Sequence, residues 1–377
     1  MTKACYVGVA GKARKVKKIY TGVANKARKV KKAYVGVGGK ARPFFSAEAK
    51  LSYYGTVTAL SQARNNVAAT TVGNYGLFGG GNTGGNASTV DAYSASLVRS
   101  TPTPLSQARF KMEATTVGNY ALFGGGNTSF NSYMSTVDAY SASLVRSTPT
   151  PMSQIRGYFA VTTVGNYGLF GGGFSNGSYL TSTVDAYSAS LVHSTPTPLS
   201  QAKAYLAATT VGNYGLFGGG GVESGDPSTV DAYSASLVRS TTTPLSQARP
   251  RPAATTVGNY GLFGGGVAAA KTVSTVDAYS ASLVRSTPAP LSQARADFAA
   301  TTVGNYGLFG GGGSSDIFDP DYVSTVDAYS ASLVRSTTTP LSQARNGLAA
   351  TTVGNYGLFG GGYGGSFSST VDAYTVV

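Results

Sequence analysis

Residues 68–93, AATTVGNYGLFGGGNTGGNASTVDAY, decide the fold, because the chain repeats this stretch almost unchanged. The steps between successive Gly-Asn-Tyr centres are 45, 47, 47, 46, 46 and 50 residues. A period of this length is typical of propellers and solenoids, in which each repeat is one structural unit. The seven centres begin at Gly73, Gly118, Gly165, Gly212, Gly258, Gly304 and Gly354.

Each repeat divides into four segments of strand length. In the first copy, residues 68–72 precede a Gly-Asn-Tyr turn, and residues 75–78 follow it and end at a run of glycines. Residues 89–93 alternate in polarity, and residues 97–101 lead into prolines, which suit an outer strand because proline cannot donate to a ladder. Four short antiparallel strands in seven copies predict an all-β fold, a seven-bladed β-propeller.

The order of these segments resembles the kelch repeat over residues 50–377. Besides the glycine run, each copy has a tyrosine near the end of its third segment: Tyr93, Tyr140, Tyr187, Tyr233, Tyr279, Tyr329 and Tyr374. Each copy also has a basic residue before its first segment: Arg64, Arg109, Arg156, Lys203, Arg249, Arg295 and Arg345. Kelch repeats usually place a tryptophan about six residues after the tyrosine. Here that position holds Arg99, Arg146, His193, Arg239, Arg285 or Arg335, so other apolar side chains are expected to join the blades.

The two ends of the repeat region complement each other. The last copy stops after residues 371–374 and lacks its fourth segment, whereas residues 51–56 form an additional strand-like segment before the first copy. We therefore expect the N-terminal strand of the propeller to complete the seventh blade. Such closure removes the free sheet edge that would otherwise invite aggregation.

The net charge of +14 lies almost entirely at the start of the chain. Residues 1–50 contain 14 Lys and Arg against the single acid Glu48, while the remainder is nearly neutral. Tyr6, Tyr20 and Tyr34 mark a period of 14 residues, which predicts a short β-meander. Such a sheet is marginally stable alone, so residues 1–46 are expected to attach to a partner or to another copy of the chain, and residues 47–377 to form the propeller.

Several classes of protein are not favoured. Clustered Lys and Arg are compatible with nucleic acid, but one tyrosine per repeat and the lack of a recognition module favour a solvated or docking face. Cys5 is the single cysteine, which excludes an internal disulfide. No apolar run has the length of a membrane span, and no apolar stretch near the N-terminus indicates a secretory signal.

Two segments of each repeat differ between the copies, while the rest is nearly identical. One is the triplet after the basic residue, at residues 65–67, 110–112, 157–159, 204–206, 250–252, 296–298 and 346–348. The other follows the glycine run, at residues 82–87, 127–134, 174–181, 221–227, 267–273, 313–323 and 363–368. In an antiparallel blade these two connections emerge at the same face of the disc, and the constant Gly-Asn-Tyr and Ser-Ala-Ser turns at the opposite face. Drift alone gives no reason for this separation.

A face of differing loops on a constant frame is typical of a recognition surface. Its enrichment in Tyr, Ser, Gly and Asn is also the composition of antibody paratopes. The alternative is that these loops merely tolerate change, which predicts polar drift and not aromatic residues. The candidate ligand-binding residues are Phe110, Lys111, Phe130, Tyr133, Tyr158, Phe159, Phe174, Tyr179, Tyr205, Arg251, Asp297, Phe318, Tyr322, Tyr363 and Phe367.

The residues needed for catalysis or for a cofactor are scarce. Some kelch propellers are copper oxidases, but copper and a Ser-His-Asp triad would both depend on His193, the single histidine. Asp316, Asp319 and Asp321 could present oxygens to Ca²⁺, but a single loop that contains a proline favours a solvated loop over a Ca²⁺ site. We therefore expect no metal site and no cofactor, and a protein that is not an enzyme.

Near-identical repeats behind a small basic head resemble proteins of phages and prophages of Gram-positive bacteria. That resemblance implies a tail-associated virion protein that acts outside the cell, contacts a host surface glycan or protein through the propeller, and docks on other tail proteins through residues 1–46. A kelch-type scaffold for protein interactions is the alternative. A third hypothesis is a glycan-active enzyme.

Overall fold

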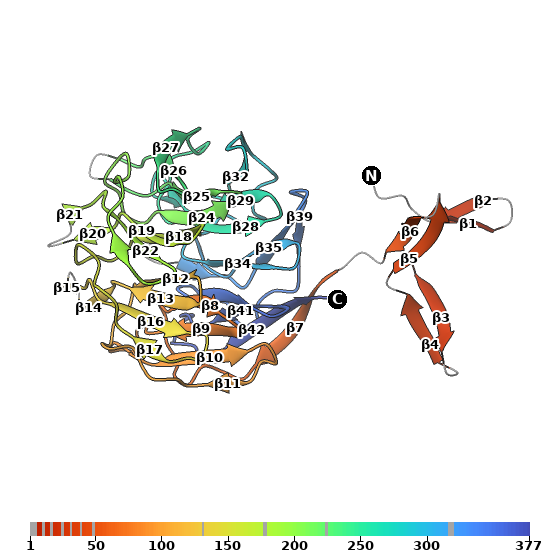
Figure 1. Ribbon diagram of the computed structural model, residues 1–377, viewed down its shortest axis with the longest axis horizontal. Coiled ribbons are helices and arrows are strands. Elements are labelled where there is room, and N and C mark those ends of the chain that lie inside the picture. Colours follow the sequence, from red (N-terminus) through yellow and green to blue (C-terminus); the bar gives the residue numbers. More distant parts are fainter. Residues whose placement is uncertain are drawn as a thin grey trace. The chain divides into compact units, whose positions relative to one another are not determined.

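The computed structural model describes residues 6–9, 12–15, 18–23, 26–30, 32–37, 40–46, 50–129, 132–175, 179–222, 225–315 and 320–377. The chain divides into two units, Leu51–Val376 and Met1–Lys50 with Val377. The larger unit is a ring of seven four-stranded antiparallel blades, which succeed one another around the ring in chain order in Figure 1. The predicted seven-bladed β-propeller is therefore confirmed.

Each blade pairs its strands in a simple meander, from an innermost first strand to an outermost fourth strand. The first three blades consist of β8 (Ala68–Val72), β9 (Tyr75–Gly79), β10 (Val90–Ser94) and β11 (Arg99–Ser100); β12 (Glu113–Val117), β13 (Tyr120–Gly124), β16 (Val137–Ser141) and β17 (Arg146–Ser147); and β18 (Ala160–Val164), β19 (Tyr167–Gly171), β22 (Val184–Ser188) and β23 (His193–Ser194). The next three consist of β24 (Ala207–Val211), β25 (Tyr214–Gly218), β26 (Val230–Ser234) and β27 (Arg239–Thr242); β28 (Ala253–Val257), β29 (Tyr260–Gly264), β32 (Val276–Ser280) and β33 (Arg285–Ser286); and β34 (Ala299–Val303), β35 (Tyr306–Gly310), β38 (Val326–Ser330) and β39 (Arg335–Thr337).

The seventh blade joins the two ends of the propeller. It consists of β40 (Ala349–Val353), β41 (Tyr356–Gly360), β42 (Val371–Val376) and, as its outer strand, β7 (Leu51–Val57). The registers Val376↔Leu51 and Val371↔Val57 mark the two ends of this pairing, so the expected closure by the N-terminal strand is confirmed. Tyr53 of β7 also donates a 2.7 Å hydrogen bond to Asp372 of β42.

The apolar core lies between neighbouring blades. One cluster joins Val72, Leu77 and Ala92 of the first blade to Phe123 and Tyr140 of the second, and similar clusters follow around the ring. A Cβ added at Gly79 would lie 2.7 Å from the Phe123 ring, which explains why glycine ends the second strand. Phenylalanine and tyrosine thus provide the apolar contact that the absent tryptophan would supply.

In the first six blades a largely buried trio of charged side chains ties the blade to the segment before it, and in the seventh Asp372 pairs with Arg345 and the Tyr53 hydroxyl. In the first blade, the carboxylate of Asp91 lies 2.6 Å from Arg64 Nη2 and 2.9 Å from Arg99 Nη1, and the side chains of Arg64 and Asp91 are fully buried. Arg64 also donates to the Phe78 carbonyl at 3.1 Å. The basic residue before the first strand and the residue at the tryptophan position therefore both neutralise one carboxylate. Buried charges of this kind are stable only when fully paired.

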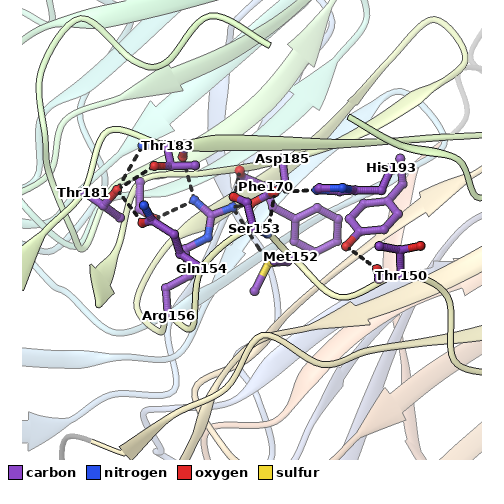
Figure 2. A network of polar contacts seen from close by, with 12 residues as sticks. Thr150, Met152, Ser153, Gln154, Arg156, Phe170, Thr181, Thr183, Asp185 and His193 are labelled. Carbon is purple, nitrogen blue, oxygen red and sulfur yellow. Dashed lines mark hydrogen bonds and ion pairs between the residues drawn. The ribbon is translucent and has the colours of Figure 1, made fainter. Parts of the chain in front are cut away.

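The third blade has the same trio with histidine as its outer member. Figure 2 shows Asp185 between Arg156 and His193, with His193 Nε2 2.6 Å from Asp185 Oδ1. The Ser153 amide donates to the same carboxylate oxygen at 2.9 Å. The single histidine thus occupies a structural position, equivalent to that of arginine in the neighbouring blades.

The basic head forms hairpins. These are β1 (Tyr6–Val9) with β2 (Lys12–Lys15), β3 (Ile19–Val23) with β4 (Lys26–Val30), and β5 (Lys32–Val37) with β6 (Lys40–Ser46), each in its own two-stranded sheet. The expected continuous meander is therefore corrected within the described part of the head. The physical reason is that a 14-residue repeat already contains two strands and a turn, so each repeat completes a hairpin by itself.

Candidate functional site

The structure brings the two varying segments of each blade together on one face, which we call the variable face. In the first blade, Asn65 of the triplet and Asn82 of the second segment exchange backbone hydrogen bonds of 3.0 and 2.8 Å. Phe110 and Asn127 form the same bridge in the second blade. The predicted convergence of the two segments is confirmed by these bridges, which recur at Gly157↔Phe174, Ala204↔Gly221, Ala296↔Gly313 and Asn346↔Tyr363.

The constant turns meet at the opposite face. A Cβ placed on Gly73 of the first Gly-Asn-Tyr turn would lie 3.0 Å from the Ala142 side chain, in the Ser-Ala-Ser turn of the next blade. Gly118 faces Ala189 in the same way at 2.8 Å. Close packing between turns leaves no room for larger side chains, which explains why this face is invariant.

The middle residues of the seven triplets encircle the mouth of the central channel, and we call them the collar. All seven have positive φ, between 50° and 58°. Their backbones are linked from blade to blade, for example Asn66 N to Gly347 O at 2.8 Å and Arg251 N to Tyr205 O at 2.7 Å. The collar consists of Asn66, Lys111, Tyr158, Tyr205, Arg251, Asp297 and Gly347.

The channel below the collar has a volume of about 460 Å³ and is lined by the inner strands. Two consecutive threonines of each inner strand form a closed belt, the threonine ring. The first threonine of each blade lies with its Oγ1 2.8–3.0 Å from Oγ1 of the second threonine in the next blade. The hydroxyl of each second threonine also donates to the backbone carbonyl of the second threonine in the preceding blade, as the Thr116 hydroxyl does to the Thr71 carbonyl. The threonine ring is therefore polar, and it is identical in every blade.

Five adjacent collar residues form an arc of aromatic and charged side chains. Lys111 Nζ lies 5.5 Å from the centre of the Tyr158 ring, and the Tyr158 and Tyr205 rings are 4.9 Å apart. The Arg251 guanidinium lies 4.8 Å from the Tyr205 ring, and its Nη1 lies 3.0 Å from a carboxylate oxygen of Asp297. All five side chains are half-buried.

The cations of this arc are incompletely paired. Within the described residues, no carboxylate lies at ion-pair distance from Lys111, whereas Arg251 has Asp297. Burial lowers the pKa of Lys111, and the nearby charge of Asp297 opposes that shift while Arg251 adds to it. The charges of Arg251 in the fifth blade and Asp297 in the sixth therefore act on Lys111, which belongs to the second blade.

Glu113 adds a carboxyl group beside the mouth. It begins the inner strand β12, at the position where the other blades have Ala68, Ala160, Ala207, Ala253, Ala299 and Ala349. Burial raises the pKa of Glu113 to about 7, and the charge of Lys111 opposes this only in part. Its charge therefore changes in the neutral pH range.

A second group of aromatic side chains lies on the seventh blade. The Tyr363 ring is 5.9 Å from Tyr322 of the sixth blade and 5.4 Å from Phe367 of its own loop. Phe367 extends toward the first blade, since a Cβ on Gly84 would lie 3.9 Å from its ring. All three rings are half-buried. The variable face therefore has aromatic groups at two separate places.

The remaining candidate residues have different surroundings. Phe174 backs the arc, with its ring 6.0 Å from Tyr158 and 5.5 Å from Tyr205, and Phe110 is half-buried in its bridge to Asn127. Tyr179 is 68% exposed at the edge of a loop hairpin. Phe130 and Phe318 lie outside the described residues, as do Asp316 and Asp319 of the suggested Ca²⁺ loop. These side chains are therefore not all part of one site.

Two candidates are corrected, because their side chains are buried. Phe159 is 2% exposed, with its ring 6.0 Å from Phe170 and 5.6 Å from the Arg156 guanidinium. Tyr133 is 5% exposed and packs against the backbone of Gly157. Phe159, a third triplet residue, fills the gap between blades, and Tyr133 of the second varying segment packs on the next blade, so neither ring is available at the surface.

Sequence comparison of the copies missed three members of the site. Asn66 and Gly347 are neither aromatic nor charged, but they occupy the same collar position as Lys111. The signal that could have found them is position in the triplet, and not residue type. Glu113 was missed because it lies one residue beyond the varying triplet, where it alone replaces alanine.

The part of the chain that the structure describes has no group of three or more His, Cys, Asp or Glu that could hold a metal ion. It also has no helix that could cross a membrane.

Comparisons with known proteins support the fold. No family model and no curated relative matches the chain. Among solved structures, the chain is similar to the structure of YjhT, with a TM-score of 0.60 and 9% sequence identity over 75% of this chain and 99% of that one. At this identity the likeness shows the β-propeller alone, a fold that serves both binding proteins and enzymes.

Proposed function

We propose that this is a non-enzymatic binding protein, which uses the variable face of the propeller to recognise a glycan or protein on a host cell surface. The observation that supports this most is the confinement of sequence change to one face. On that face the changes bring Lys111, Tyr158, Tyr205, Arg251 and Asp297 into contact around the channel mouth. Rigid tyrosines beside adaptable polar residues are what paratopes use to bind varied ligands.

We further propose that the protein is a tail-associated virion component that acts outside the cell. The basic head would attach to other tail proteins, and several copies of the chain would act together. Weak individual sites gain overall affinity when they are presented in several copies, which suits recognition of a repetitive surface polymer. Recovery of the chain with purified virions separates this proposal from a scaffold that binds partner proteins elsewhere.

The decisive experiment measures binding of the labelled full-length protein to cells of candidate host strains. The variant carries asparagine, the residue of the first blade, at collar positions 111, 158, 205 and 251. Asparagine suits these positions because it tolerates positive φ. Lost cell binding with an unchanged melting temperature supports the proposal, and equal binding by both proteins overturns it.

A glycan-active enzyme is the second candidate, and Glu113 favours it. A carboxyl group with a pKa of about 7 has the protonation behaviour of a general acid at neutral pH. Turnover of host-surface polysaccharide that is lost in Glu113→Gln would establish this function. An unchanged polysaccharide after prolonged incubation would exclude it for the substrate tested.

A further inference from the structure

We propose that the collar binds an anionic sugar unit, whose carboxylate or phosphate lies between Lys111 and Arg251 and whose ring stacks on Tyr158 and Tyr205. This inference rests on the proposed function, and it specifies the chemical class of the ligand. It depends on the arrangement of five neighbouring collar side chains. The residue at this position of the repeat varies from blade to blade.

The two cations at the mouth have complementary roles. Lys111 has no ion-pair partner among the described residues, and burial lowers its pKa, so its charged form gains from an added anion. Arg251 is already oriented by its 3.0 Å contact with Asp297. Arg251, held in place by Asp297, can orient an anionic group, and the unpaired charge of Lys111 can attract it.

The tyrosine pair supplies a platform for the sugar ring. Tyr158 and Tyr205 lie 4.9 Å apart at 60° to each other, and Phe174 contacts both rings from the same loop cluster. Aromatic faces carry partial negative charge and attract the C–H groups of a sugar. Tyrosine hydroxyls in addition donate and accept hydrogen bonds to sugar hydroxyls.

The collar residues opposite the tyrosines have small side chains. Gly347 has no side chain, and Asn66 has a short amide. A ligand that rests on the tyrosines therefore has access from the seventh and first blades. Near that side, Tyr322, Tyr363 and Phe367 could contact further units of the same polymer.

The test is titration calorimetry of the full-length protein with three probes of equal length: an oligogalacturonate, an oligo(glycerol phosphate) and a neutral malto-oligosaccharide. We expect at least one anionic probe to bind about tenfold more tightly than the neutral probe, and its affinity to fall with added salt. The carboxylate and phosphate probes distinguish a uronic acid from a phosphate-containing polymer as the source of the anion.

Variants locate the interaction. Lys111→Asn and the double change Arg251→Asn with Asp297→Asn should each weaken the anionic probe about tenfold and leave the neutral probe unchanged. Tyr158→Asn with Tyr205→Asn should weaken every sugar. The matched control is Val145→Ser, an exposed residue beside a constant turn and outside the variable face, which should change nothing.

Each outcome decides the inference. Equal affinity for neutral and anionic probes, no binding of either anion, or binding that Lys111→Asn leaves intact overturns it. The proposed function is judged separately by cell binding: if the protein binds host cells and the collar variant does not, that function stands even when the anionic probes fail. No binding to any candidate host cell would remove the proposed function, while the calorimetry with the anionic probes still decides the inference.

Discussion

The collar and the threonine ring surround the same channel in layers close together, yet one varies from blade to blade and the other does not. Hydrogen bonds join neighbouring blades in both, in a complete circle in the threonine ring and at five of the seven blade junctions in the collar. In the threonine ring the bonds run through side-chain hydroxyls, so every blade must supply the same residue. In the collar the bonds run from backbone N–H to backbone carbonyl, so any residue that tolerates positive φ preserves them.

This difference shows how a repeat protein can change its surface without changing its fold. Where backbone hydrogen bonds join the blades, the side chain can vary. A position whose side chain makes the structural contact is fixed. The blade thus separates stability from recognition within a few residues of the inner strand.

The contrast between constant and varying positions is tested most severely by removing one carboxylate from the constant frame and one from the collar. Asp138→Asn removes the carboxylate between Arg109 and Arg146 and leaves buried positive charge, which should cost about 3–5 kcal/mol of unfolding free energy. Asp297→Asn breaks the half-exposed pair with Arg251, tolerates the positive φ of the collar, and should cost less than about 1 kcal/mol. Denaturant unfolding of both variants measures the difference, and similar costs would contradict the separation.

The threonine ring is tested by Thr116→Val, which keeps the shape of the side chain and removes its hydroxyl. Thr70 and the Thr71 carbonyl each lose a partner, so we expect a loss of about 2–3 kcal/mol. Thermal unfolding provides the measurement. The control is Ser96→Ala on the exposed constant turn, and a Thr116→Val variant as stable as that control would show that the belt contributes nothing.

Glu113 lies between the collar residue Lys111 and the ring threonines Thr115 and Thr116, and it makes the free energy of unfolding depend on pH. Its pKa is raised to about 7 in the folded protein from an ordinary value of 4.5, so folding binds a proton between these values and stability falls as the pH rises. Glu113→Ala, the residue of the other blades, should therefore stabilise the protein by about 3 kcal/mol at pH 8 and by almost nothing at pH 4. Unfolding curves at the two pH values decide this, and an equal effect at both would contradict the raised pKa.

The smallest effect is expected from a single collar change. Lys111→Asn keeps the backbone bond from residue 111 to the Asn66 carbonyl, and asparagine adopts positive φ more readily than lysine. The melting temperature should stay within about 2 °C of the wild type, corresponding to less than about 0.5 kcal/mol. A large loss of stability would show that the Lys111 side chain itself supports the fold.

Much of the fold could be predicted from the sequence, because the repeats report the same structure seven times. The glycine run after Phe78, the alternation before Tyr93 and the missing fourth segment after Tyr374 together specify blade number and closure. The sharing of one face by both varying segments also followed from antiparallel connectivity.

The site was harder to predict, because residue type was a poor guide to exposure. Phe159 and Tyr133 resemble binding aromatics in the sequence, but neighbouring blades bury them. Whether a third triplet residue faces the solvent depends on the adjacent repeat, which is about 46 residues away in the chain. The left-handed backbone of the collar has no mark in the sequence either, since Lys111, Tyr158 and Arg251 rarely adopt it.

Closure by β7 has a mechanical consequence. The chain enters the propeller at Leu51, beside Val376, which packs against the constant turn at Gly304. The point of entry is therefore on the face opposite to the collar. A pulling force between a ligand held at the collar and the chain at Leu51 acts along β7 and loads its hydrogen bonds to β42 in shear. Bonds in shear share the load instead of opening one after another, so the propeller can resist traction along this axis.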